Sequence, residues 1–111
     1  MSLTPVSHTV EVGEIRNVAI DFRGKLDDGE TLSGLPVVAE LTTTDLTISN
    51  QAINSLATVV VNASTVPLNQ AVLFKVLGFA SGVKYRVKVT IGTNAVPPQT
   101  LIEDIVIKTL E

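Results

Sequence analysis

The side chains that could act in catalysis are few and widely separated in this sequence. His8 is the only histidine, it lies near the N-terminus, and there is no cysteine to pair with it. A Ser-His-Asp system would need this imidazole, at a chain end where mobility is common, so we do not expect one. Phosphate-binding loops, glycine-rich dinucleotide turns and HExxH sequences are absent too. The sequence therefore predicts a protein that is not an enzyme, with no catalytic residue and no cofactor.

Four acidic residues lie close together in the first third of the chain, at Asp21, Asp27, Asp28 and Glu30. Calcium usually takes about six to eight oxygen ligands, and this spacing does not match the loop of an EF-hand. No second acidic cluster lies nearby. We interpret these residues as a solvated turn and predict no metal site.

Residues Asn62-Ala63-Ser64 match the glycosylation sequon, a triplet that arises by chance in Ser- and Thr-rich chains. The first five residues contain no basic region and no long apolar segment, so a cleavable signal peptide is not expected. The sequon therefore gives almost no support for glycosylation of Asn62. The final dipeptide, Leu110-Glu111, matches a vector scar before a purification tag and is left out of functional argument.

Composition excludes several classes of protein. Hydrophobic residues make up 45% of the chain and charged residues 17%, so intrinsic disorder is not expected. The longest apolar stretch, residues 71–80, is interrupted by Lys75 and is shorter than the ~18 residues of a membrane span. The net charge of −3 and the lack of a basic block make nucleic acid a poor partner. The surplus of apolar residues favours burial against another protein, although an ordinary neutral surface on a Thr- and Val-rich β-protein fits equally well.

Alternating apolar and polar residues predict strands along most of the chain. The predicted strands cover residues 18–23, 35–41, 46–49, 57–61, 73–79, 84–90 and 101–110. Turns are expected at residues 27–29, at Asn50, at 62–64 and in the loop containing 92–94 and 96–98. Pro36 is acceptable only at the start of its strand or on a sheet edge.

Residues 64–78 are ambiguous. Ser64 and Thr65 could cap a helix, Pro67 could occupy its first turn, and Gly78 could end it. The run 73–79 also fits a buried strand, and an isolated helix in an all-β chain needs more support. We predict a strand.

The most specific local pattern is a turn containing Gly82, followed by Tyr85 at the start of an alternating strand. It resembles the tyrosine corner of immunoglobulin and fibronectin type III domains, in which the hydroxyl bonds back to the backbone. The alternative is simply an aromatic residue at a strand start. We expect Tyr85, Val87 and Val89 to be buried with Ile20 and Phe22, since alternating residues share one face of a strand.

About seven short strands with regularly spaced turns are typical of a β-sandwich. We therefore predict an all-β fold, an immunoglobulin/fibronectin III-like β-sandwich of about seven antiparallel strands. Residues 1–111 form one domain, because the chain is too short for two cores.

Two stretches resemble the bacteriophage fibre-tail adaptor family of small immunoglobulin-like virion proteins. The first is residues 18–22 followed by 26–32. The second is residues 74–90, which contain Gly78, Gly82 and Tyr85, with Glu103 and residues 105–107 as the closing strand. This chain has Phe22 and no Trp where the family often carries Trp, and Phe79 where a second Gly is expected.

The resemblance implies a structural protein of a phage or prophage virion, made in the bacterial host cytoplasm, that joins tail parts or carries fibres. Its partners would be other tail or fibre proteins, with an oligomer in the assembled particle and no contact with nucleic acid or membrane. The isolated domain would be monomeric or weakly associated. The alternative is an immunoglobulin-like binding or adhesion module of a bacterial surface protein.

Overall fold

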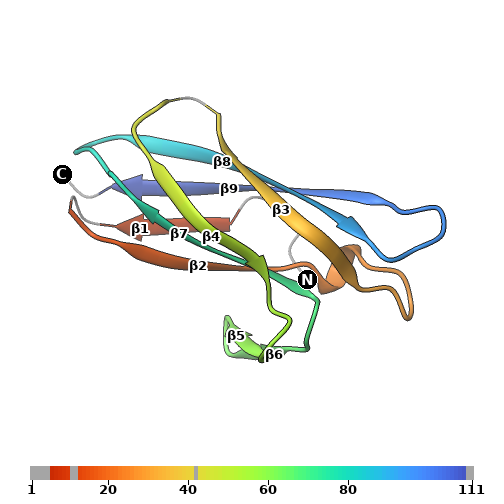
Figure 1. The fold of residues 1–111 in the computed structure, drawn as a ribbon. Coiled ribbons are helices and arrows are strands. Elements are labelled where there is room, and N and C mark those ends of the chain that lie inside the picture. Colours follow the sequence, from red (N-terminus) through yellow and green to blue (C-terminus); the bar gives the residue numbers. More distant parts are fainter. Residues whose placement is uncertain (1–5, 11–12, 42, 110–111) are drawn as a thin grey trace.

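The computed structural model describes residues 6–10, 13–41 and 43–109, with only the backbone described for 6–10. These residues form nine strands and one short 3-10 helix (Figure 1). The elements are β1 (Val6–Val10), β2 (Arg16–Asp21), η1 (Arg23–Lys25), β3 (Leu32–Glu40), β4 (Thr47–Ile53), β5 (Val59–Val61), β6 (Ser64–Val66), β7 (Ala71–Leu77), β8 (Lys84–Thr93) and β9 (Thr100–Thr109).

The strands form two main sheets that face each other, in a β-sandwich-like arrangement (Figure 1). One sheet has the order β1-β9-β8-β3 and the other β2-β7-β4, while β5 and β6 form a separate hairpin. Consecutive strands β2 and β3 lie in different sheets, so the chain crosses between the layers. In Figure 1 the β5–β6 hairpin projects below the sandwich.

The core lies between the two sheets because every second residue of each central strand points inward. Strand β7 contributes Val72, Phe74 and Val76, while β8 contributes Tyr85, Val87, Val89 and Ile91. The expected burial of Tyr85, Val87 and Val89 in one cluster with Ile20 and Phe22 is confirmed.

Two departures from the prediction concern the number of strands and their direction. The described residues contain nine strands rather than about seven, because β1 and the short β6 have no clear alternating pattern in the sequence. The pairing is also not wholly antiparallel, since β1 runs parallel to β9 with His8 opposite Ile107. The backbone of His8 therefore lies in a strand.

Two predicted turn positions lie inside strands instead. Asn50 does not end its strand: it lies inside β4 with φ of 56°, at a shift of register between Ser49 and Ala52. Gly92 and Thr93 belong to β8 rather than to the following loop. Pro36 lies on the edge strand β3, at another register shift, as expected for a residue that cannot donate a ladder hydrogen bond.

The ambiguous segment 64–78 is extended, as predicted, but it contains two strands, β6 and β7, rather than one. Asn69 between them has φ of 62°, which breaks the helical repeat that the apolar spacing would allow. Within the described residues, the three-residue η1 is the only helix, so no helix there is long enough to cross a membrane.

Candidate interaction surfaces

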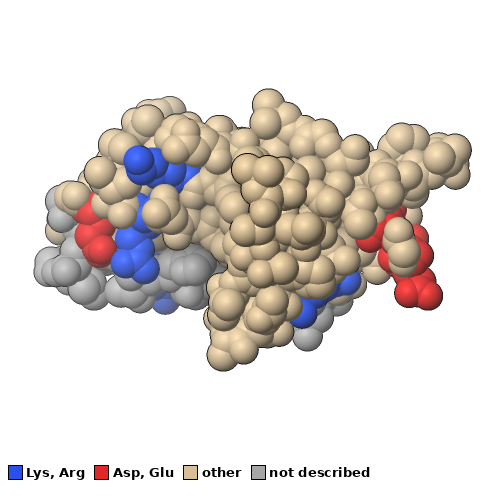
Figure 2. All heavy atoms as spheres, turned by 60° about the horizontal axis from the view of Figure 1, so that its bottom comes forward, with Lys and Arg blue, Asp and Glu red and all other residues tan. Residues whose placement is uncertain are grey.

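The middle of the chain carries no charged side chain at all. Asp, Glu, Lys, Arg and His are absent between Asp45 and Lys75, a run that spans β4, the β5–β6 hairpin and most of β7. Figure 2 shows most charged side chains in view toward the two ends of the molecule, with a broad uncharged area between them. A partner that contacts only residues 46–74 therefore meets no charged side chain from this run.

The β5–β6 hairpin and its flanking turns expose large apolar side chains. Leu56 is 97% exposed and Val60 is 68% exposed, and Leu68, two residues after β6, is exposed as well. We call these three residues the hairpin surface. Single exposed apolar residues are common on proteins, but several on one uncharged projection are typical of a contact site.

The hairpin itself is a tight two-residue turn. Asn62 and Ala63 both have positive φ, 50° and 64°, which is the geometry of a type I′ turn. Asn tolerates this region, whereas Ala is strained there. The turn exposes the sequon Asn62, and the hydroxyl of Ser64 in the same sequon accepts a hydrogen bond from Arg23.

Arg23 joins the β5–β6 hairpin to the sandwich through hydrogen bonds. Its guanidinium donates to the Ser64 hydroxyl at 2.9 Å and to the Thr65 carbonyl at 3.0 Å, and Asp21 holds the same guanidinium through both carboxylate oxygens at 2.7–3.1 Å. Burial alone would raise the pKa of Asp21, but the hydrogen bonds and charge of Arg23 outweigh it and lower that pKa. The hairpin therefore depends on an ion pair outside itself.

Asn54 stabilises the chain segment that leads into and out of the β5–β6 hairpin. Its buried side chain accepts hydrogen bonds from the backbone N–H groups of Gln70 and Ala71, both at 3.0 Å, and donates to the Pro67 carbonyl at 2.8 Å. These bonds close residues 54–71 into a loop of defined shape. The hairpin surface is thus held in place from both sides, which reduces the entropy lost when it binds.

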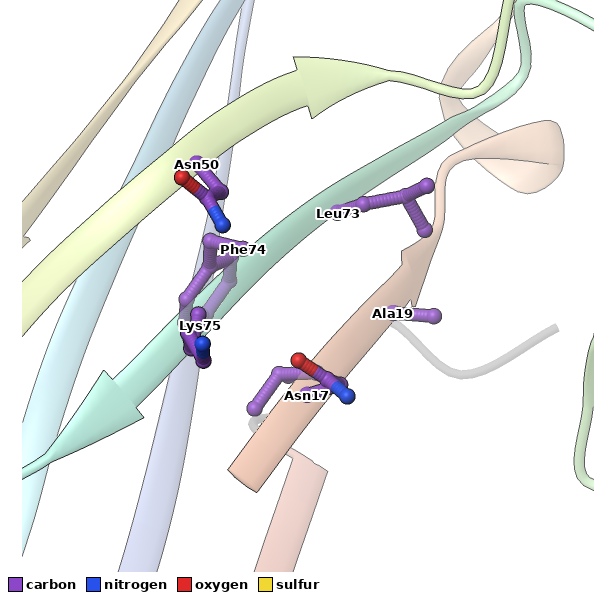
Figure 3. Close-up of a pocket in the computed structure, with 7 residues that line it drawn as sticks. Asn17, Ala19, Asn50, Leu73, Phe74 and Lys75 are labelled. Carbon is purple, nitrogen blue, oxygen red and sulfur yellow. The ribbon is translucent and has the colours of Figure 1, made fainter. Parts of the chain in front are cut away.

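Two shallow depressions lie on the surface, and of their lining residues only Lys75 is charged. A groove of about 450 Å³ runs between the start of β3 and the end of β4, where Leu35, Ser55 and Asn69 form part of its wall. A hollow of about 300 Å³ lies on the outer side of the β2-β7-β4 sheet, with Ala19 and Leu73 between Asn17 and Asn50 (Figure 3). Neither brings together groups that could carry out a reaction.

The turn before β8 has the geometry of a tyrosine corner. The Tyr85 hydroxyl accepts a hydrogen bond from the Ala80 backbone N–H at 2.8 Å and donates one to the Asp45 carboxylate at 3.1 Å. Burial raises the pKa of Tyr85 above its ordinary value of 10.0, and the Asp45 charge raises it further. The corner thus connects the β7–β8 turn to the β3–β4 connection.

Two glycines allow this corner to form. Gly82 has φ of 69° in the turn itself. At Gly78, φ is 98° and an added Cβ would lie 2.5 Å from the Asp45 carbonyl oxygen, closer than real Cβ atoms approach. The ring of Phe79 packs edge-on against Tyr85, with centroids 5.9 Å apart.

The acidic residues predicted as a solvated turn do not all point to water. Glu30 is buried, where it accepts hydrogen bonds from the Asp27 backbone N–H at 2.8 Å and from the Gln99 side chain at 3.1 Å. Asp27 and Asp28 are exposed as expected, and Asp21 is used by Arg23. The described residues contain no group of three His, Asp or Glu side chains placed to hold a metal ion.

A second buried carboxylate lies at the same end of the molecule. Glu103 faces the core side of β9, and its Oε1 lies 3.7 Å from the Lys25 ammonium nitrogen. Burial raises the pKa of Glu103 above its ordinary value, and Lys25 only partly opposes this. No sequence motif predicts that Glu103 is buried or that the hairpin surface exists. The absence of charged residues from 46 to 74 is the one sequence signal that could have indicated the hairpin surface.

Comparison of the chain with protein-family models, curated proteins and solved structures finds no match.

Proposed function

We propose that the two sheets form an immunoglobulin-like β-sandwich. In that fold, strands B, E and D form one sheet and C, F and G the other, and a tyrosine near the start of strand F bonds to the backbone at the E–F corner. The sheet orders β2-β7-β4 and β3-β8-β9 fit this pattern, with Tyr85 at the β7–β8 corner. The β5–β6 hairpin is then an insertion between strands D and E.

We further propose that the chain is a structural protein of a phage or prophage virion, a tail or fibre adaptor that acts through contacts with other tail or fibre proteins. The family resemblance of residues 18–22, 26–32 and 74–90, with Glu103 and residues 105–107, supports the class. The observation that supports the proposed binding function is the uncharged hairpin surface, because it projects from the sandwich and exposes Leu56 and Val60. In the virion, the hairpin surface is buried against the neighbouring tail or fibre protein.

The experiment is co-expression of the tagged chain with the products of the genes on either side of its own. The expected result is a co-purifying complex with a tail or fibre protein that survives moderate salt, since apolar contacts are not screened. Leu56→Asp should abolish the complex without altering the fold, because Leu56 lies outside the core. Glu14→Ala, at a charged residue far along the chain from the hairpin, is the control and should leave the complex intact.

Two outcomes would contradict the proposal. Neighbouring genes without relation to portal, tail or fibre proteins would remove the virion assignment. Failure to bind any neighbour, together with specific binding on a glycan array, would instead favour an adhesion module.

A further inference from the structure

The fold gathers basic side chains on one part of the outer face of the four-stranded sheet. Lys84, Arg86 and Lys88 alternate along β8 with fully buried core residues, so these three side chains point outward. Lys108 lies on β9 directly opposite Lys84 and is exposed as well. We call these four residues the basic patch. A chain with a net charge of −3 therefore carries half of its eight Lys and Arg residues on one small area.

Only one carboxylate of the described residues lies in register with the basic patch. Asp104 lies opposite Lys88, and its Oδ2 is 3.8 Å from the Arg86 guanidinium. Glu40, on the neighbouring strand β3, accepts hydrogen bonds from two backbone N–H groups of the β3–β4 connection, both at 3.0 Å. The three lysines of the basic patch form no ion pair with any described residue. Most of the positive charge is therefore not neutralised.

The pairing of Lys84 with Lys108 costs stability. Side chains directly opposite each other on antiparallel strands have Cβ atoms about 4.5–5.5 Å apart, so two ammonium groups at this position repel each other. A neutral residue at either position would remove the repulsion without touching the core, because both side chains are exposed. Pairs that oppose stability in this way are typical of binding sites, where a ligand supplies the missing opposite charge.

From this arrangement we propose that the basic patch binds an acidic, extended segment of a partner protein, with carboxylates at alternate positions. Alternate residues of a strand are about 6.8 Å apart, so the row from Lys84 through Arg86 to Lys88 spans roughly 14 Å. An extended peptide has the same repeat, so Asp or Glu at every second position brings one carboxylate to each basic residue of the row. Lys108 lies beside Lys84 and meets the carboxylate at that end of the segment.

A nucleic acid fits the same charges less well. The aromatic side chains of the chain are all buried, so none is available to stack on a base: Phe22, Phe74, Phe79 and Tyr85. The protein as a whole has a net charge of −3, which repels a long polyanion outside the basic patch. A short acidic peptide segment meets only the basic patch.

The basic patch and the hairpin surface lie on different parts of the molecule. The basic patch is on β8 and β9, at the end of the molecule marked C in Figure 1, whereas the β5–β6 hairpin projects below the sandwich. Salt weakens a contact through the basic patch but not one through the uncharged hairpin surface. We assign the acidic segment to a protein other than the tail or fibre protein proposed for the hairpin surface, so either proposal can fail without the other.

Titration of the full chain with a defined peptide, followed by 15N–1H NMR, tests the proposal. The probe is a peptide of four Glu-Thr repeats, and a peptide of four Gln-Thr repeats is its neutral control. Exposed ion pairs are individually weak, so we expect a Kd on the order of 1 mM at about 20 mM NaCl, and at least about tenfold weaker binding at about 500 mM. Shifts should centre on residues 84–88 and 104–108 and be absent with the neutral peptide.

A charge-neutralising variant separates binding from stability. Lys108→Gln should weaken binding of the Glu-Thr peptide at least about threefold and raise the Tm by roughly 1–4 °C, because it removes the repulsion with Lys84. Lys75→Gln, at a lysine on the outer face of the other sheet, is the matched control and should change neither quantity.

Four results would overturn the proposal. They are equal binding of the Glu-Thr and Gln-Thr peptides, shifts centred away from the basic patch, an affinity that Lys108→Gln leaves unchanged, and tighter binding of a thymidine oligonucleotide with the same number of charges as the Glu-Thr peptide. The last result would show that the basic patch binds nucleic acid instead.

Discussion

Removing the Tyr85 hydroxyl should destabilise the corner without disturbing the core. Tyr85→Phe keeps the ring and its edge-on contact with Phe79 but deletes the bonds to the Ala80 N–H and the Asp45 carboxylate. A neutral hydrogen bond contributes about 0.5–1.5 kcal/mol, and one to a charged acceptor contributes more when it is buried. Asp45 is exposed, which keeps its bond near the lower value.

The expected loss is about 1–2 kcal/mol of unfolding free energy, a fall in Tm of roughly 4–8 °C for a chain of this size. Urea unfolding followed by circular dichroism measures it. A double-mutant cycle with Asp45→Ala isolates the second bond, and a coupling of about 0.5 kcal/mol or more is expected. Asp28→Ala, at an exposed acidic residue in another turn, is the control and should be additive with Tyr85→Phe.

A Tyr85→Phe variant whose denaturation midpoint equals that of the wild type would refute the reasoning. It would mean that the hydroxyl bonds contribute nothing net, and that Tyr85 is only an aromatic residue at the start of a strand.

Four further predictions concern other parts of the molecule. Ala63→Gly should stabilise the protein by up to about 1 kcal/mol in urea unfolding, because glycine relieves the positive φ of the hairpin turn; destabilisation would contradict the turn geometry. Arg23→Ala should speed amide exchange in the β5–β6 hairpin while β8 is unchanged, and Arg16→Ala, which removes only an exposed ion pair with Glu14, should not. The raised pKa of Glu103 means that the native state holds this proton more tightly than the unfolded chain, so stability should fall as pH rises from about 4.5 through the native pKa; Glu103→Gln should remove that fall in melts across this range. Melts with excess chelator and with millimolar calcium should coincide, and a shift of several degrees would revive a metal site at Asp27, Asp28 and Glu30.

Local alternation was enough to predict the strands that form the core. Strand β8 is the clearest case, since Tyr85, Val87 and Val89 alternate with charged residues and each is fully buried. The tyrosine corner was also predictable, because a glycine turn followed by tyrosine is a local pattern. Its second partner, Asp45, was not, since it lies 40 residues earlier in the chain.

Features that depend on distant pairing could not be predicted from the sequence. Strand β1 forms by parallel pairing with β9, at the far end of the chain. Asn50 and Gly92 look like turn residues, but Asn50 lies at a register shift inside β4 and Gly92 pairs with Thr100 of β9. In the sequence Glu30 looks like part of a solvated turn, but the fold places Gln99 beside it and the Gln99 side chain donates a hydrogen bond to its carboxylate. The hairpin surface has no motif, and only the absence of charge marks it.

The salt dependence of binding between this chain and a neighbouring tail or fibre protein tests the central claim most directly. Binding through the uncharged hairpin surface predicts a Kd that changes less than about threefold between 50 and 500 mM NaCl. A Kd that weakens by about a hundredfold over that range would place the contact on the charged ends of the molecule and contradict the account.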